Sequence, residues 1–239
     1  MTIDGYDIAG LHCRQHRVTF GHSDVKSDSE WTEGAILPSF YQNHLKMLEM
    51  TLTIAVYGSS RYEIDHRISD LLARFLNPVT VHLDLYTDRQ YRLIMMDHSE
   101  KEIRRNGCHL VDIKCRGYCF GAEVSASTSG TSLTLTNPGN LLSPLRLEIM
   151  PTASTLSLTL TNVCHDPVSG ADLPLVIRNV AIGNKITIDG MTGKVLQGVS
   201  SKVKDVDMWA LPALLPGEQT ITISATGQTV TAAVTPLYL

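Results

Sequence analysis

Apolar and polar residues alternate along most of this chain, with the period of two that places successive side chains on opposite faces of a β-strand. The clearest early example begins at Leu48, after which every second residue through Val56 is apolar while Glu49, Thr51 and Thr53 stand between them. The same pattern predicts further strands at residues 11–20, 79–85, 91–96, 108–120, 133–135, 145–149, 156–160 and 175–177. The sequence therefore predicts a mainly β protein.

One segment has the period of a helix instead. Ser60 followed three residues later by Glu63 is a capping box, in which the serine side chain accepts from a backbone N–H of the first turn. Pro78 ends the segment because proline cannot continue a helix. The apolar face expected between them consists of Ile64, Ile68, Leu71, Leu72, Phe75 and Leu76. We predict one amphipathic helix among strands, an α+β arrangement for the first half of the chain.

Two segments interrupt the alternation. Val25–Ala35 is polar and uneven, so we predict a loop there. Ser125–Gly130 has a linker-like composition, and it lies where a charge-rich first half gives way to a second half rich in Ser, Thr, Leu, Val and Gly. We therefore predict two domains, residues 1–125 and residues 131–239, joined by that linker.

The last third of the chain, from Lys185 to Leu239, carries the sharpest succession of patterns. It contains ITIDG before a glycine-bearing turn, the apolar stretch WALPALLPG, an ITI strand straight after Pro-Gly, and a second alternating strand. Alternation predicts one inward set of side chains in the last two strands, with the threonines at 220, 222, 229 and 231 outward. The inward set is Ile221, Ile223, Val230 and Val234.

This succession resembles the C-terminal domain of the distal tail protein (Dit) family of long-tailed bacteriophages. A closing Val-x-Pro-x-Tyr, made by Val234, Pro236 and Tyr238, completes the resemblance. Gln219 departs from it, because family members often carry Asn after the Pro-Gly. The first half resembles the N-terminal domain of the same family by its layout and by its strand–Tyr-Gly–helix order.

The resemblance implies both a fold and a role. Residues 1–125 would form a tail-tube-like β-sandwich or split barrel with one flanking helix, and residues 131–239 a galectin-like β-sandwich. The protein would be a structural component of the virion tail, made in the host cytoplasm, with no enzymatic activity. It would form a homo-hexameric ring between the tail-tube protein and the tail-tip or receptor-binding proteins, and DNA would pass through its channel without specific binding.

Composition is compatible with this role and excludes others. With 43% hydrophobic and 18% charged residues, a net charge of −4 and a pI near 6.1, the chain is an ordinary globular protein without a basic surplus for nucleic acid. No apolar run approaches the roughly 20 residues needed to cross a bilayer. The first ten residues lack the basic start and apolar core of a signal peptide. A mildly acidic first domain would not retain the phosphates of passing DNA.

Motifs for catalysis or cofactor binding are absent from the sequence. It contains no glycine-rich phosphate loop, no Gly-x-Ser-x-Gly and no His-Glu-x-x-His. His12 and His16 would stand ~13 Å apart on a strand, too far to share a metal ion. Isolated carboxylates occur at Asp84, Asp88, Asp97, Glu63 and Asp65. Helix capping and the helix dipole explain the last two, so we predict no catalytic, cofactor or metal site.

Five cysteines, an odd number scattered over a long chain, do not form a disulfide framework. Cys108, His109, Cys115 and Cys119 allow a zinc site as one interpretation. On a strand, however, Cys115 and Cys119 would lie ~13 Å apart. Zinc needs sulfur atoms ~2.3 Å from one ion. Buried reduced thiols are the favoured interpretation, and it extends to Cys13 and Cys164.

The stretch from Trp209 to Leu215 has two interpretations. An exposed indole beside aliphatic side chains could stack on a sugar, which would make the chain a glycan-binding, lectin-like module. Alternatively these residues plug the open end of the sandwich, with Leu211 and Leu214 covering the core. The second interpretation is favoured, because aromatic residues make up only 6% of the chain and sugar sites usually combine several of them with polar groups.

Overall fold

The computed structural model describes residues 1–21, 25–30, 39–103, 107–166 and 169–239. The protein is mainly β, with several antiparallel sheets, and its described residues contain a single α-helix. The predicted fold class is therefore confirmed. The chain divides into two compact units, a first unit of residues 1–120 with Leu239 and a second unit of residues 121–238.

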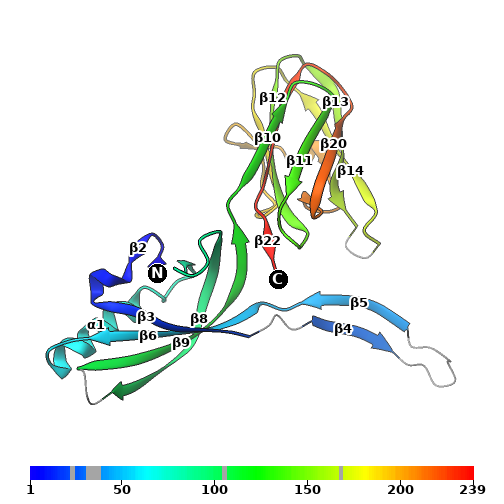
Figure 1. The fold of residues 1–239 in the computed structure, drawn as a ribbon. Helices are drawn as coiled ribbons and strands as arrows, with labels where there is room; N and C mark the ends of the chain where they lie inside the picture. Colours follow the sequence, from blue (N-terminus) through cyan, green and yellow to red (C-terminus); the bar gives the residue numbers. More distant parts are fainter. Residues whose placement is uncertain (22–24, 31–38, 104–106, 167–168) are drawn as a thin grey trace. The chain divides into compact units, whose positions relative to one another are not determined.

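The first unit is built around one sheet, in which β2, β1, β7, β8, β9, β6 and β3 are neighbours in that order (Figure 1). In the strand β6 the even-numbered residues from Met50 to Val56 are buried and Glu49 is exposed, as expected, but Thr53, predicted on the polar side, and Ala55 are buried too. The short 3-10 helix η1 (Ile8–Leu11) precedes β3. The strand bounds are β1 (Thr2–Ile3), β2 (Tyr6–Asp7), β3 (Cys13–Gly21), β6 (Leu48–Tyr57), β7 (Val79–His82), β8 (Arg89–Ile103) and β9 (Cys108–Gly121).

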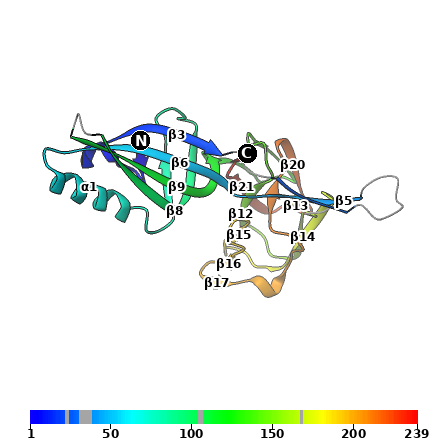
Figure 2. The same ribbon diagram turned by 90° about the horizontal axis from the view of Figure 1, so that it is seen from below.

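The predicted helix is present as α1 (Arg61–Ala73), which runs alongside the sheet (Figure 2). The Ser60 hydroxyl accepts from the Glu63 backbone N–H at 3.2 Å, as the capping box requires. The Glu63 carboxylate accepts from the backbone N–H of Ser59, at 2.8 Å, rather than from that of Ser60. The assignment of Leu76 to the apolar face of the helix is wrong. Its side chain is 76% exposed, because α1 ends three residues before it. The buried members are Ile64, Ile68, Leu71 and Phe75.

A separate two-stranded sheet lies between β3 and β6 in the sequence. Its strands β4 (Val25–Glu30) and β5 (Ser39–Leu45) pair with each other in antiparallel fashion (Figure 1). The loop predicted at Val25–Ala35 is therefore wrong for residues 25–30, and residues 31–35 lie outside the described residues. The segment VKSDSE has only one apolar residue, so apolar and polar residues do not alternate in it. Main-chain hydrogen bonds between two strands form without such alternation, and the strand was therefore not detected.

Two further strand predictions in the first unit need correction. The strand expected through residue 85 ends at His82, and Leu85 is exposed. The strand expected at residues 91–96 extends to Ile103 as β8. Its added residues are mostly charged and exposed. They therefore lack the alternation of apolar and polar residues by which a half-buried strand is predicted.

The second unit is a sandwich of two main sheets (Figure 1), as predicted. One sheet has the order β10-β21-β12-β15-β16-β17, with β19 beside β12, and the other the order β11-β20-β13-β14-β18. The strands of the first are β10 (Val124–Thr128), β12 (Ser143–Pro151), β15 (Ile186–Asp189), β16 (Val195–Gln197), β17 (Ser200–Ser201), β19 (Ala213–Leu214) and β21 (Gln228–Val234). The others are β11 (Ser132–Asn137), β13 (Thr155–His165), β14 (Asp172–Val180), β18 (Val206–Asp207) and β20 (Gly217–Ile223). The 3-10 helix η2 (Val203–Asp205) precedes β18, and the short β22 (Leu237–Tyr238) is the last strand of the chain.

The core of the sandwich lies between these two sheets. The predicted inward residues Ile221, Ile223, Val230 and Val234 are all buried, and the threonines between them are exposed or half-buried. The predicted register of the last two strands is therefore confirmed. Leu156, which was expected to join the same apolar set, is 88% exposed at the beginning of β13.

The linker predicted at Ser125–Gly130 is wrong. Most of it belongs to β10, which pairs with β21 from Val124 opposite Val234 to Thr128 opposite Val230. Small hydroxyl residues suit a linker, but they also suit a strand whose outer face meets solvent. Separate folding of residues 1–125 and 131–239 stays a prediction.

Candidate functional site

The five cysteines are free and buried, as predicted. Cys108, Cys115 and Cys119 all lie on β9. Burial raises the pKa of Cys115 to about 12 and that of Cys164 to about 12, so both remain thiols rather than the thiolates that bind metals or attack substrates. The described part of the chain holds no group of three or more His, Cys, Asp or Glu residues placed to bind a metal ion.

The histidines and carboxylates considered from the sequence do not come together. His12 has a left-handed backbone (φ 53°) at the end of η1, whereas His16 lies within β3. Asp97 pairs with Lys114 at 3.3 Å. Hydrogen bonds from the Ser59 hydroxyl and backbone lower the pKa of Glu63. The remaining carboxylates pair with a neighbouring cationic group: Asp65 with Arg61, Asp84 with the Met1 ammonium, and Asp88 with Arg89.

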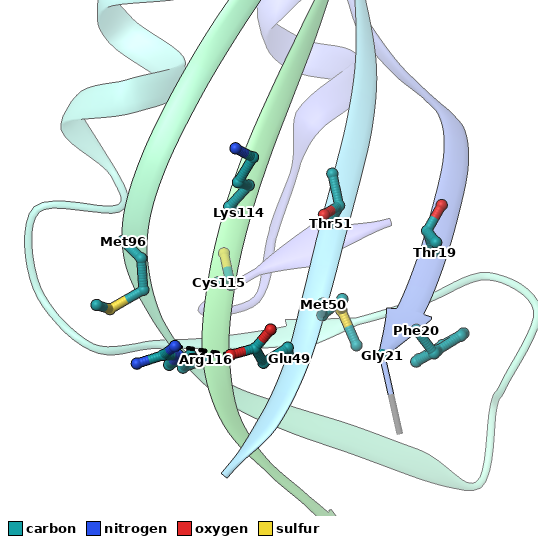
Figure 3. Close-up of a pocket in the computed structure, with 10 residues that line it drawn as sticks. All are labelled: Thr19, Phe20, Gly21, Glu49, Met50, Thr51, Met96, Lys114, Cys115 and Arg116. Atoms are coloured by element: carbon teal, nitrogen blue, oxygen red, sulfur yellow. Dashed lines mark hydrogen bonds and ion pairs between the residues drawn. The ribbon is translucent and has the colours of Figure 1, made fainter. Parts of the chain in front are cut away.

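A shallow groove of about 330 Å³ crosses the strands β3, β6, β9 and β8 of the first unit (Figure 3). Arg116 and Glu49 face each other across β9 and β6, with an N–O distance of 2.7 Å. Lys114 stands opposite Thr51 and pairs with Asp97. Each charged side chain that lines the groove is thus neutralised by a neighbour. This arrangement suits a contact surface better than a catalytic pocket.

The strand β3 forms one edge of the sheet in the first unit. An edge strand presents main-chain N–H and C=O groups that can pair with another chain. Arg14, His16 and Arg17 are exposed along it, and charged side chains of this kind limit non-specific pairing. The hairpin of β4 and β5 follows β3 in the sequence. The edge of β3 therefore offers the first unit a polar surface for pairing with another chain.

In the second unit the stretch after β18 does not plug the sandwich as expected. Trp209 is 85% exposed and Leu211 is 48% exposed, so the favoured interpretation is wrong for both. Leu214 is fully buried, as predicted. The reason is alternation: Met208 and Ala210 pack against the core, which turns Trp209 outward.

Two polar groupings of the second unit escaped the sequence analysis. Arg178 on β14 donates to the Asp207 carboxylate on β18. The buried Lys202 donates from Nζ to the Asn179 carbonyl oxygen at 3.0 Å and the Asp205 carboxylate at 3.0 Å. Alternation around the core residues of β14 could have placed Arg178 outward. No local pattern reveals that β14 and β18 are neighbours.

None of the helices in the described ranges is both long and apolar enough to cross a bilayer. The fold and these surfaces define a mainly β protein of two units, whose second unit is a β-sandwich. Burial raises the pKa of its thiols, and the charged side chains that line the groove are paired.

The fold is that of a phage distal tail protein. The structure is similar to the crystal structure of the SPP1 Dit protein, described as a paradigm of the hub adsorption apparatus in phages that infect Gram-positive bacteria. The TM-score is 0.79 at 13% sequence identity, over 99% of this chain and 98% of that one. The resemblance to the Dit family is thus confirmed at the level of the fold.

Two structures of the phage p2 baseplate in its activated conformation contain similar chains. The chain from the form with Ca has a TM-score of 0.53 at 8% identity, over 97% of this chain and 92% of that one. The chain from the form with Sr has a TM-score of 0.51 at 9% identity, over 95% and 92%. No family model and no curated protein matches this chain in sequence.

Proposed function

We propose that this protein is a structural component of a phage tail, a distal tail protein located at the tip of the tail tube. The observation that carries the proposal is the completeness of the likeness to SPP1 Dit, which spans nearly the whole of both chains. A match over both units, in one order, supports a shared architectural role more strongly than a match of one sandwich would, because single β-sandwiches serve many functions. The absence of catalytic motifs from the sequence is compatible with this role.

Residues 1–125 would form a homo-hexameric ring stacked on the tail-tube protein, with a channel for the passing DNA. The open edge of β3 and the two-stranded sheet of β4 and β5 support this part of the proposal. A two-stranded hairpin alone is marginally stable in water, so a second copy of the chain is a suitable partner for it. Identical head-to-tail contacts close into a ring when the rotation between copies allows it. The number six follows from the resemblance to the family.

Residues 131–239 would carry or brace the tail-tip or receptor-binding proteins. A β-sandwich is a rigid scaffold on which loops can position binding residues for such partners. The protein would therefore reside in the virion tail, and DNA would pass it without specific binding. The near-neutral groove of the first unit, with each lining charge paired, is compatible with a surface that does not retain phosphates.

The proposal is tested on the full chain, purified alone and together with the tail-tube protein of the same phage. Mass photometry and electron microscopy should detect a six-membered ring with an open channel, at the end of assembled tubes or free. A variant in which a short Gly-Ser turn replaces residues 22–45 should keep its circular dichroism spectrum and lose the ring. Leu156→Ala, an exposed position on the sandwich, serves as the matched control and should assemble normally. Monomers alone, at high concentration and beside the tube protein, would contradict the proposal.

A further inference from the structure

The sheet of the first unit has a second free edge besides β3. The strands β3, β6, β9 and β8 follow one another across this sheet (Figure 2). On the side of β8 that faces away from β9, the short strand β7 pairs with it only as far as Leu93. Within the part of the chain that the structure describes, no strand lies on that side of residues 94–103. The four strands therefore end in two free edges, β3 on one side and residues 94–103 of β8 on the other.

The edge formed by β3 is basic. It contains Arg14 and Arg17 and no carboxylate. Both arginines are exposed, as is His16 between them. Among the described residues neither arginine has an ion pair or a hydrogen-bonded carboxylate, although most other arginines of the first unit do. Two unpaired guanidinium groups on a free edge are available to a carboxylate of another chain.

The edge formed by β8 is acidic. Residues 94–103 contain three carboxylates and one lysine, and all of residues 97–102 are exposed. Two of the carboxylates, Asp97 and Glu102, pair with basic side chains of their own copy at 3.3 Å each. Glu100 has no such partner in the described ranges. The two free edges thus present unpaired charges of opposite sign.

The directions of the strands allow one edge to pair with the other. The strand β6 is antiparallel both to β3 and to β9. Since β8 ends at Ile103 and β9 begins at Cys108, the connection is too short for the crossover of a parallel pair, and these two are antiparallel as well. The strands β3 and β8 therefore run in opposite directions. Copies rotated about an axis along the strands bring β3 of one beside β8 of the next as an antiparallel pair.

The unpaired charges stand at about the same level of the sheet. Through β6, Arg14 lies level with Leu110 of β9. Gly117 lies against the main chain of β8 at Leu93, whose Cα would be 3.0 Å from an added Cβ. Leu110 precedes Gly117 by seven residues, and Glu100 follows Leu93 by seven. Antiparallel pairing therefore places Glu100 about level with Leu110 and so with Arg14.

We propose that β3 of one copy pairs with residues 94–103 of the next copy, and that Arg14 and Arg17 bind Glu100 across this contact. The inference rests on the proposed ring and names the residues that join its copies. Main-chain hydrogen bonds join the two edges, and opposite charges on neighbouring strands stabilise their pairing. Each copy uses two different edges, so every copy in the series can bind two others, and such head-to-tail contacts close into a ring.

A second copy in this orientation fits the edges better than other arrangements do. The two edges have similar lengths, nine residues in β3 and ten from residue 94 to residue 103. A symmetric dimer through β3 would place the arginines of one copy beside those of the other, and like charges on paired strands are destabilising. The same repulsion disfavours pairing of two β8 edges. The charges therefore select the head-to-tail contact over both symmetric ones.

The test uses the full chain and two variants with reversed charge. Arg14→Glu combined with Arg17→Glu makes both edges acidic, and Glu100→Arg removes the unpaired carboxylate of the β8 edge and adds a cation. Mass photometry should show that each variant alone assembles at least tenfold more weakly than the parent. An equal mixture of the two should restore the ring, because each contact then joins opposite charges. Native mass spectrometry should find equal numbers of both chains in that ring.

Two controls accompany these measurements. Lys194→Glu combined with Lys204→Glu reverses two exposed charges of the second unit and should assemble like the parent. Salt at about 1 M, where the Debye length is ~3 Å, should weaken the ring of the parent. Because Arg14, Arg17 and Glu100 are exposed, unchanged melting curves will confirm that the variants fold.

Several results would overturn the inference. Full assembly by either charge-reversed variant shows that these edges do not join the copies, and a mixture that stays unassembled rejects the pairing of their charges. If the arginine variant keeps its ring and instead loses the tail-tube protein, the basic edge contacts that protein. A ring of the parent that the variants do not affect rejects the inference alone. A parent that forms no ring, with or without the tube protein, rejects the proposed function and the inference with it.

Discussion

Ile223 lies directly opposite Leu160 where β20 pairs with β13, and both side chains are buried in the core of the sandwich. The next pair along the ladder, Thr222 opposite Thr161, faces the other way, and Thr222 is exposed. A shift of one residue in this pairing would exchange the two sets. The Ile223–Leu160 pair therefore fixes the register of the last long strands.

Truncation at these neighbouring positions should have very different costs. Ile223→Ala removes buried methyl groups and should destabilise the second unit by ~2–5 kcal/mol, whereas Thr222→Ala should cost under ~1 kcal/mol. Hydrogen exchange of peptides from β13 and β20 in the full chain measures both values. A larger effect of Thr222→Ala would mean that the register is wrong by one residue.

Gly190 should not tolerate a side chain. A Cβ at this position would lie 1.9 Å from the carbonyl oxygen of Pro212, a main-chain atom that cannot rotate away. Gly190→Ala should therefore destabilise the sandwich by about 3 kcal/mol. Gly130→Ala is the matched control, because its nearest neighbour would be the Thr128 Oγ1 at 3.5 Å. Thermal unfolding compares the two, and equal melting temperatures would contradict the described packing.

The N-cap of α1 should be measurable by itself. Ser60→Ala removes the side-chain acceptor for the Glu63 backbone N–H and should cost about 1 kcal/mol. Ser60→Asp should retain most of the stability, because aspartate is an equally good N-cap residue. Urea denaturation followed by far-ultraviolet circular dichroism tests this. Equal stability of Ser60→Ala and the parent would refute the cap.

The buried thiols should resist modification while the protein is folded. Burial raises the pKa of Cys13 to about 11, and that of Cys115 to about 12, so almost no thiolate is present near neutral pH. A thiol reagent such as DTNB should therefore react slowly with the native protein. In denaturant all five cysteines should react quickly. Rapid reaction of one or more native thiols would show that the corresponding part of the core is open.

Lys202 should contribute a stability that depends on pH. Lys202→Met leaves the Asn179 carbonyl and the Gln197 side-chain oxygen without this donor, and should cost about 2 kcal/mol. Hydrogen bonds from Lys202 and then Asn179 lower the pKa of Asp205 below its ordinary value of 3.8. A lowered pKa stabilises the folded state above the unfolded value, and this contribution is lost as the pH falls through the folded value.

Unfolding measured from about pH 7 to about pH 2 separates these effects. The parent should lose more stability below pH 3.8 than Lys202→Met, because the variant no longer has the Lys202 contribution to the Asp205 shift. Lys204→Met, a neighbouring substitution of the same type at an exposed position, should leave the curve unchanged. Parallel curves for the parent and Lys202→Met would contradict the coupling.

The sequence predicted those elements whose burial follows a regular period. The helix α1 and the inward residues of β20 and β21 combine one apolar face with one polar face, so their periodicity predicted them correctly. In β6 alternation predicted the buried residues from Met50 to Val56 but not the burial of Thr53 on the other face. The strands β4 and β10 were missed because they are held by main-chain pairing and are rich in small or polar residues. The composition of such strands does not indicate which other strand they pair with.

The surfaces were harder to predict than the core. Trp209 follows β18, a strand of two residues that pairs with β14. No local sequence pattern predicts that pairing. Arg178 and Asp207 are separated by 29 residues in the chain, so only the tertiary fold brings them together. The buried cysteines were predictable, because an isolated thiol in a long chain behaves as a small apolar side chain.

Val124 and Val234 stand opposite each other at the same end of the β10–β21 ladder. The chain thus enters and leaves the sandwich at adjacent points. A sandwich attached in this way can be replaced as one unit. Another domain with neighbouring ends can take its place and leave the strands before it undisturbed.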